Sequence, residues 1–135
     1  VDPFLIAPTL ILAIAQRLVR KIDADCAQEI DEPGVKAIID DSFKTLADEY
    51  KKDLPLDKNP KNAVPSSSNP SGLKGRMPVI EILEVDHEIQ NLILGRKPED
   101  DIWQVARKKG MISMREDAII KSLEGIVPFT EVDSL

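Results

Sequence analysis

The sequence is poor in the residues that build cross-links and metal sites. Cys26 is the one cysteine, so no disulfide forms within the chain, and a reducing compartment suits it. His87 is the one histidine, and since Asp86 and Glu88 do not share a helical face with it, we expect a solvent-facing residue rather than a catalytic base. No apolar run reaches the roughly 18 residues that a membrane-spanning helix needs. These shortages favour one soluble, domain-sized unit.

Positive charge is also scarce. Eighteen Lys and Arg stand against 24 Asp and Glu, for a formal net charge of −6. Because binding to a phosphate backbone needs clustered bases, we expect no nucleic-acid partner. Bases do gather at Arg17, Arg20 and Lys21 and again over 107–109. The second cluster is typical of a helix C-terminus, where cations interact favourably with the helix dipole.

A phosphate-binding loop is missing as well. No G-x-x-x-x-G-K-[ST] string occurs, so the backbone N–H groups and the lysine that would hold nucleotide phosphates are absent. We therefore expect no ATP hydrolysis from this segment alone, and no catalytic residue in it. The first residue is Val1 rather than methionine, and we expect a piece of a longer protein.

The second half of the chain has clear periodicity. Residues 77–85 form a short apolar run rich in Val, Ile and Leu, which predicts a buried strand. Asp86 is placed to cap a helix, and Gly95 stands where a left-handed residue would end it.

Two further helices follow. The first is predicted to begin at Pro98, with three acids in its first turn, and to end before Gly110. The next begins with a capping box between Ser113 and Glu116 and stops at Gly125.

The first half is less regular. Apolar residues from Phe4 to Ile14 predict a helix, which we expect to begin near Pro8 because an interior proline removes a hydrogen bond. In residues 17–22 basic and apolar side chains alternate imperfectly. Residues 33–53 read as one amphipathic helix, and residues 54–72, dense in Pro, Ser and Asn, as a loop or flexible linker.

Several strings carry a resemblance to a known family. They are K-G-R-x-x-(V/I)-x-E-(I/V)-L, then G-M-x-(S/T)-(M/L)-R-E-D, a helix ending in G-I, and A-Q-R-L-V-R within the first 22 residues. The chain resembles, over 1–22 and 73–135, the C-terminal part of the ATPases of type II secretion and type IV pilus assembly.

This resemblance implies an α+β fold, mostly α. Residues 1–22 would be a helix and a strand from the edge of a P-loop ATPase core, 23–72 an insertion, and 73–135 a C-terminal strand and small helical subdomain. It also implies a cytoplasmic homohexamer, peripheral to the inner membrane, that couples ATP hydrolysis to an inner-membrane platform protein. ATP and Mg²⁺ would bind mainly upstream. The alternative is a stand-alone helical protein-interaction module without ATPase activity, which would use the Ile102 and Ile119 faces.

The resemblance also bears on zinc. Members of the family often carry two C-x-x-C pairs, whose four thiolates complete a tetrahedral shell. In this sequence the first pair falls on Asp23 and Cys26, and the second on Pro65 and Ser68. We therefore expect no zinc and no other metal.

The site residues follow from the same strings. Guanidinium groups suit phosphate and carboxylate pairing, so the arginines in family strings are either near the nucleotide or in structural ion pairs. Trp103 is expected at a helix or subunit contact. The Arg-Glu-Asp string at 115–117 either fixes the helical subdomain against a neighbour or forms a capping box with a solvated face. The nucleotide-proximal candidates are Arg17, Arg20 and Arg76, and the subunit-contact candidates are Trp103, Arg115, Glu116 and Asp117.

Overall fold

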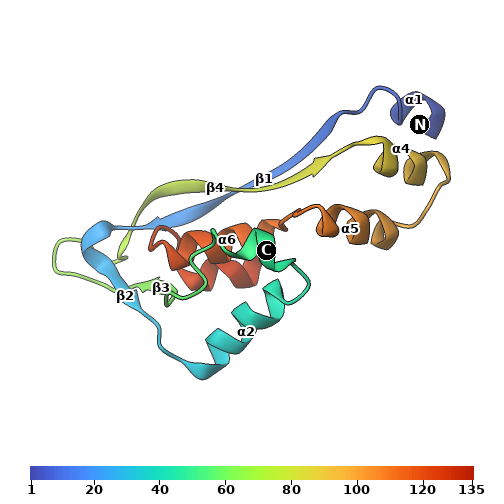
Figure 1. Ribbon diagram of the computed structural model, residues 1–135. Helices are drawn as coiled ribbons and strands as arrows, with labels where there is room; N and C mark the ends of the chain where they lie inside the picture. The colour runs from blue at the N-terminus through green and yellow to red at the C-terminus, as the bar shows by residue number, and fades with distance from the viewer.

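The computed structural model describes residues 1–135 and is elongated along one two-stranded ribbon (Figure 1). In this long ribbon β1 (Leu12–Ile22) pairs antiparallel with β4 (Leu73–Glu84). Ile14 lies opposite Ile82, and the register shifts after Arg20. A second, short sheet near one end pairs β2 (Ala27–Glu29) with β3 (Lys61–Ala63).

Helices fill the rest of the fold, and they hold more residues than the strands, so the α+β prediction is confirmed. The α-helices are α1 (Pro3–Ile6), α2 (Pro33–Phe43), α3 (Asp48–Lys51), α4 (His87–Leu94), α5 (Glu99–Lys108) and α6 (Met114–Leu123). Two 3₁₀ helices are η1 (Ala24–Cys26) and η2 (Phe129–Ser134).

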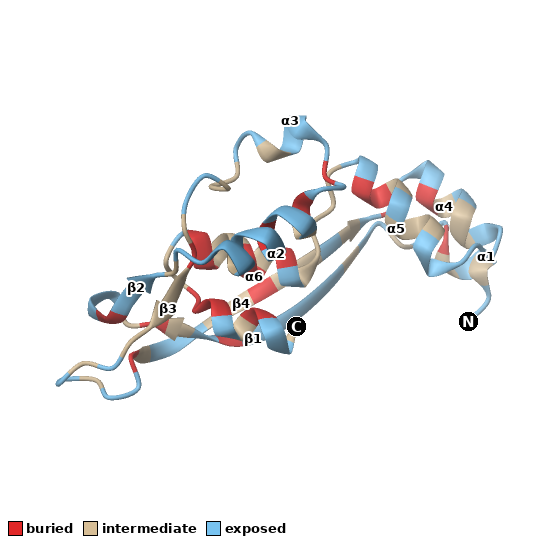
Figure 2. Cartoon of the chain, turned by 90° about the horizontal axis from the view of Figure 1, so that it is seen from below, coloured by how far each residue is buried: buried red, intermediate tan, exposed pale blue.

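The main core lies between one face of the long ribbon and helices α2, α6 and η2. Because side chains alternate along a strand, Val19 and Val79 point to this face and are buried, while their neighbours point away. Figure 2 shows the buried residues concentrated here and β1 exposed along much of its length. The core residues are Val19, Ile39, Phe43, Leu46, Val79, Ala118, Ile119, Leu123, Val127, Phe129 and Val132.

A small core lies at the other end of the ribbon, where α4 packs on α5. It is built on Val85, Ile89 and Ala106. Asp86 caps α4 as predicted, accepting hydrogen bonds from the Glu88 and Ile89 amides at 3.1 Å each.

The N-terminal helix is shorter than predicted. Asp2 caps α1, which ends at Ile6, and the apolar residues from Leu12 onward belong to β1. The helix prediction for this run is therefore wrong. Proline breaks the helix at Pro8, and pairing with β4 satisfies the backbone of the following residues instead.

The predicted helix over 33–53 is also divided. Its first part, α2, ends at Phe43, and the free carbonyl of Ser42 near this end accepts a hydrogen bond from the Arg107 side chain, 3.1 Å away. The Leu46 amide bonds to the Phe43 carbonyl instead, and Leu46 turns into the main core. Residues 54–72, expected to be without regular structure, contain β3.

The end of α4 differs in one residue from the prediction. Gly95 has an ordinary φ of −75°, and Arg96 takes the left-handed conformation with φ of 51°. The amides of Arg96 and Lys97 bond to the carbonyls of Ile93 and Leu92, which is a Schellman motif. Gly110 and Gly125, with φ of 93° and 81°, do follow α5 and α6 in left-handed conformations as glycine stop signals.

Candidate functional site

A buried cluster around Arg107 joins three segments of the chain. The side chain of Arg107, 3% exposed, reaches from α5 to α6 and to the end of α2. Its two terminal nitrogens bond to both Glu116 carboxylate oxygens at 2.7 and 2.8 Å. The remaining N–H groups donate to Thr45 Oγ1, the Met111 carbonyl and the Ser42 carbonyl. All five guanidinium donors are therefore satisfied.

Glu116 has a second role in this Arg107 cluster. It also accepts from the Ser113 amide at 3.0 Å while Ser113 Oγ accepts from the Glu116 amide, so the predicted capping box is confirmed. The Trp103 ring lies below the Arg107 guanidinium, 5.5 Å from its centroid, in a cation–π contact.

The basic cluster at 107–109 is thus more than a helix end. Arg107 and Lys108 do lie in the last turn of α5, as predicted for a helix C-terminus, but Arg107 also makes the buried contacts described above. Its spacing of four from Trp103, which places both side chains on one face of α5, was the available signal.

Lys109, the last residue of the basic cluster at 107–109, connects the two ends of the small core. Its Nζ lies 2.6 Å from carboxylate oxygens of Asp86 and Glu88, at the start of α4. The hydrogen bond from Lys109 lowers the pKa of Asp86, and the Asp86 hydrogen bond raises the pKa of Lys109. The start of α4 is thereby tied to the end of α5.

Asp117 covers the outer edge of β4. It accepts from the Ile80 amide at 2.8 Å and pairs with Lys121 at 2.6 Å, and Lys121 in turn donates to the Pro78 carbonyl. Glu116 and Asp117 therefore both make contacts inside the chain. Arg115, between Ser113 and Glu116, is exposed, and Trp103 is half-buried.

Of the nucleotide-proximal candidates, Arg20 and Arg76 lie opposite each other and Arg17 lies apart from them. Arg17 donates to the Ser134 carbonyl at 3.0 Å, and Arg20 pairs with Glu131 at 2.6 Å. Arg76 lies opposite Arg20 in the register and is exposed. By strand alternation, Arg17 points to the other face of the ribbon.

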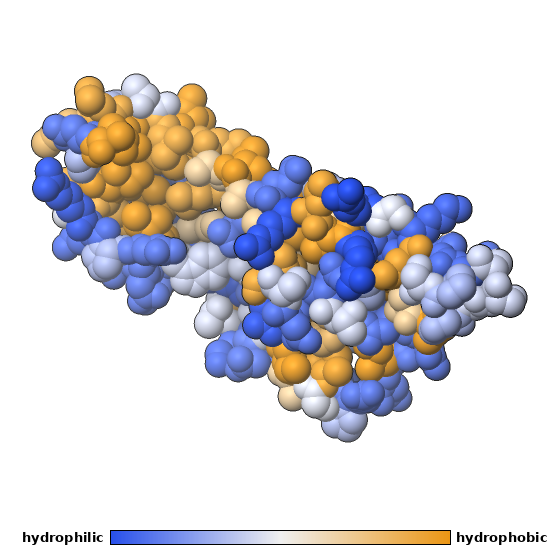
Figure 3. All heavy atoms as spheres, turned by 180° about the vertical axis from the view of Figure 1, so that it is seen from behind, coloured by the Kyte–Doolittle hydropathy of each residue, from blue (hydrophilic) through white to orange (hydrophobic).

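The open side of the ribbon and the adjoining helix present an apolar surface. Seen from behind in Figure 3, hydrophobic residues gather over the end of the molecule that carries α1 and α4. Side chains here are between 45% and 77% exposed. We define this apolar face as Phe4, Leu5, Ile11, Leu12, Ile14, Leu18 and Ile82.

One edge of β1 is unpaired beside this face. The edge is covered only near its end, where Glu131 accepts from the Arg20 amide and the Ile22 amide bonds to the Ile126 carbonyl. β1 pairs with no strand except β4, so over 12–18 its outward N–H and C=O groups are free to pair with another strand.

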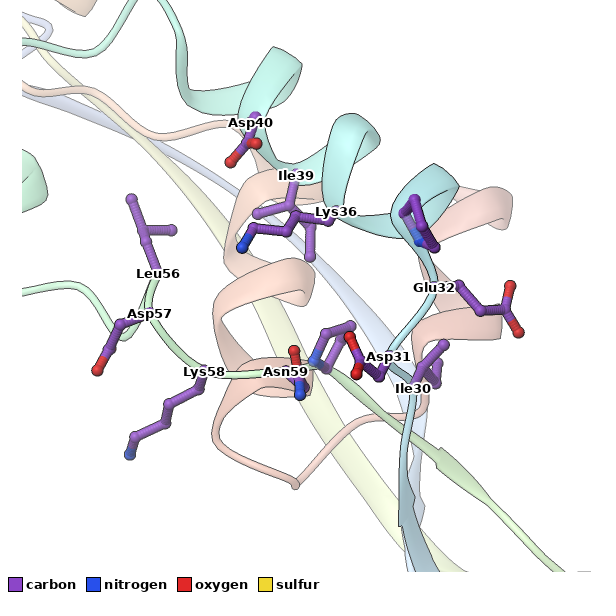
Figure 4. A pocket seen from close by; sticks show the side chains of 12 residues that line it. Ile30, Asp31, Glu32, Lys36, Ile39, Asp40, Leu56, Asp57, Lys58 and Asn59 are labelled. Atoms are coloured by element: carbon purple, nitrogen blue, oxygen red, sulfur yellow. The ribbon is translucent and has the colours of Figure 1, made fainter.

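Two of the hollows on the surface lie next to β1 and the insertion. One, of about 280 Å³, lies between the free part of β1 and α5 and is mostly apolar, with Ala13, Leu83, Ile102 and Trp103 in its wall. The other, of about 180 Å³, is shown in Figure 4, where Glu32, Asp57 and Lys58 point their charged ends away from its centre. Its lining mixes both charges, so we assign no ligand to it.

No helix is both long enough and apolar enough to cross a bilayer. The model of the type II/IV secretion system protein family matches residues 1–134. The chain belongs to this family. The resemblance inferred from short strings is thereby confirmed.

Its relatives in the type II/IV secretion system protein family are ATPases and secretion proteins by name. The chain is 31% identical to the type IV pilus assembly ATPase PilB of Thermus thermophilus, over 98% of this chain and 14% of that protein. It is 32% identical to the type II secretion system ATPase E of Vibrio cholerae, over 98% of this chain and 24% of that protein. It is 30% identical to the type II secretion system protein E of Xanthomonas campestris, over 98% of this chain and 22% of that protein. The chain thus spans a seventh to a quarter of the length of these relatives.

Proposed function

We propose that this chain is the C-terminal segment of a cytoplasmic ATPase of secretion or pilus assembly. It couples ATP hydrolysis in an upstream body to the membrane assembly machinery. The observation that carries this proposal is the apolar face beside the free edge of β1, in a chain whose relatives are several times longer.

The apolar face supports docking on a larger body. Fully burying one Leu or Ile side chain contributes about 1.5–3 kcal/mol. Large contiguous apolar patches on a protein surface usually mark interaction sites. The free edge of β1 offers the backbone groups that would extend a sheet from this body into the ribbon. The ribbon is then the edge of the P-loop core.

The rest of the assembly follows from the family. We propose a homohexamer peripheral to the inner membrane, whose partner there is the platform protein of the machine. ATP and Mg²⁺ bind mainly in the upstream body. Trp103, half-buried on α5, and Arg115, exposed on α6, are the first candidates for contact with a neighbouring subunit. Glu116 and Asp117 bond within the chain, so they would affect such a contact only by holding α6 in position.

The test compares ATP hydrolysis by this chain with that of the full-length protein. We expect activity only in the full-length protein. Ile14→Ser combined with Ile82→Ser should lower it at least about tenfold, because two apolar contacts are lost at the docking surface. Ile38→Ser, at another exposed apolar side chain on α2, is the matched control and should have little effect.

An inactive full-length protein would overturn the ATPase proposal. The stand-alone interaction module would then be preferred, and the apolar face would be its binding surface. If the double variant and the Ile38→Ser control lower ATP hydrolysis equally, the apolar face is not the docking surface.

The same assay distinguishes the arginines. Arg76 makes no side-chain hydrogen bond within the chain, so Arg76→Ala should lower activity at least about tenfold if its guanidinium reaches a phosphate. Lys58→Ala, an exposed base on the insertion, is the control. For Arg20, the activity of Arg20→Ala is compared with that of Glu131→Ala, which removes its ion-pair partner. Equal losses for Arg20→Ala and Glu131→Ala would assign Arg20 to the structural ion pair rather than to nucleotide.

A further inference from the structure

The insertion between β1 and β4 is closed at its base by two segments that run antiparallel. We call residues 23–30 and 60–72 the neck. The β2–β3 ladder forms its middle. Two more hydrogen bonds extend it, from the Ile30 amide to the Pro60 carbonyl at 2.9 Å and from the Val64 amide to the Cys26 carbonyl at 2.8 Å. The Asp23 amide bonds to the Gly72 carbonyl at 2.9 Å. The neck therefore brings the two ends of the insertion together.

Asn69 is the centre of the open end of the neck. Its Nδ2 donates to Asp23 Oδ2 and to the Leu73 carbonyl, both at 3.0 Å. Its Oδ1 accepts from the Ser71 amide at 3.2 Å and from Ser71 Oγ at 2.8 Å. Ser66 completes a tight turn, since its Oγ accepts from the Asn69 amide. Every polar atom of the Asn69 side chain is therefore used.

The neck is too narrow for a side chain at Gly72. Its φ is +67°, and an added Cβ would lie 2.6 Å from the Val64 carbonyl oxygen. The hydrogen bond from Asn69, followed by the charge of Lys74, lowers the pKa of the Asp23 carboxyl, so Asp23 is held in its charged, accepting form.

The residues at this place do not fit a zinc ion. The positions that the family resemblance gives to four thiolates are Asp23, Cys26, Pro65 and Ser68. Proline offers no ligand atom, Cys26 is buried, and the Ser68 hydroxyl shares a hydrogen bond with Ser66 at 3.2 Å. No group of three or more His, Cys, Asp or Glu side chains in the chain could hold a metal ion. A structural zinc site needs four donors of the thiolate or imidazole kind.

We propose that the hydrogen bonds of Asn69 to Asp23 and Leu73 close the neck in place of a metal, so that the insertion keeps its position without zinc. Farther along the neck, Ser122 of α6 binds both backbone groups of Lys61, and Asn62 accepts from the Thr130 amide. Closing the neck therefore holds β3 on α6 and η2, and leaves α2 beside the Arg107 cluster.

The test exchanges donor and acceptor. Asn69→Asp places a second carboxylate beside Asp23 and should lower the Tm by about 3–6 °C. Asp23→Asn combined with Asn69→Asp restores a donor facing an acceptor and should recover at least half of the loss. Asn91→Asp, the same charge change at an exposed site on α4, is the control and should move the Tm by less than about 1 °C.

Metal dependence is measured on the same purified chain. Neither EDTA nor 1,10-phenanthroline should lower the Tm, and added ZnCl₂ should not raise it. The proposal is overturned if the purified chain contains one zinc ion per molecule, or if a chelator lowers its Tm. It is also overturned if Asn69→Asp lowers the Tm no more than the Asn91→Asp control does. If Asn69→Asp does not fold, recovery of a folded chain in the double variant supports it and failure to recover contradicts it.

Discussion

Arg107 shows how much one side chain can connect. Burying a guanidinium costs several kcal/mol unless its charge is paired and its donors are used. Here the Glu116 carboxylate supplies the charge, and three oxygens from Thr45, Met111 and Ser42 take the other donors. No buried side-chain polar atom in the chain lacks a hydrogen-bond partner. The cluster therefore fixes α2, α5 and α6 in one arrangement.

Replacing Arg107 by lysine should test this arrangement. An ammonium has three donors and no planar fork, so it leaves oxygens of the cluster without partners. We expect Arg107→Lys to lower the free energy of unfolding by about 3 kcal/mol in urea titration. Arg115→Lys, at an exposed arginine on α6, is the matched control and should change it by less than about 0.5 kcal/mol.

A second variant separates pairing from packing. Arg107→Met combined with Glu116→Met removes both charges and keeps most of the volume, so it should be more stable than Arg107→Met alone. If Arg107→Met and the double variant are equally stable, the single variant is destabilised by something other than the loss of the ion pair.

The elements with local signals were predicted well from the sequence. Asp86, Ser113 and the glycines at 110 and 125 act within one turn of their helices, and each does so in the structure. The larger errors lie where distant residues decide. The strand at Leu12 depends on β4, about 70 residues away, and Leu46, after the end of α2, turns into a core that β1, β4 and α6 build.

The same distinction explains the candidate site. The capping box at Ser113 could be predicted because its partners are three residues apart. The full set of partners around Arg107 could not, because Ser42 and Thr45 are 65 and 62 residues away. The apolar face was hidden for another reason, since apolar side chains such as buried Val19 and exposed Leu18 lie on both faces of β1, and no alternation marks the open face.

The turn between α4 and α5 offers a test at the level of the element. Arg96 occupies a left-handed position that costs a residue with a Cβ roughly 1 kcal/mol, and glycine avoids that cost. Arg96→Gly should therefore raise the free energy of unfolding by about 0.5 kcal/mol, after the entropy that glycine adds to the unfolded chain. Arg96→Ala keeps the Cβ and should show no such gain. A destabilised glycine variant would mean that the arginine side chain itself holds the turn.

At the scale of the whole molecule, two cores are joined by the long ribbon. The main core packs on one half of it, and the small core closes on its far end. The apolar face runs from α1 along the open side of β1, and Figure 3 shows hydrophobic residues gathered over the end that carries α1 and α4. The side that we propose to dock on an ATPase body is therefore separate from the side that carries the insertion.

The ribbon also has mechanical leverage. At about 3.3 Å per residue, the 12 residues of β4 form an arm about 40 Å long. Tilting such an arm by about 5° at one end moves the other end by about 3 Å. The two strands keep one register from Leu12 to Arg20 and shift only before Ile22, so most of the arm would tilt as one unit. A small rotation at the docked half of β1 would thus displace the opposite end of the ribbon, where the insertion joins it, by about the length of a hydrogen bond.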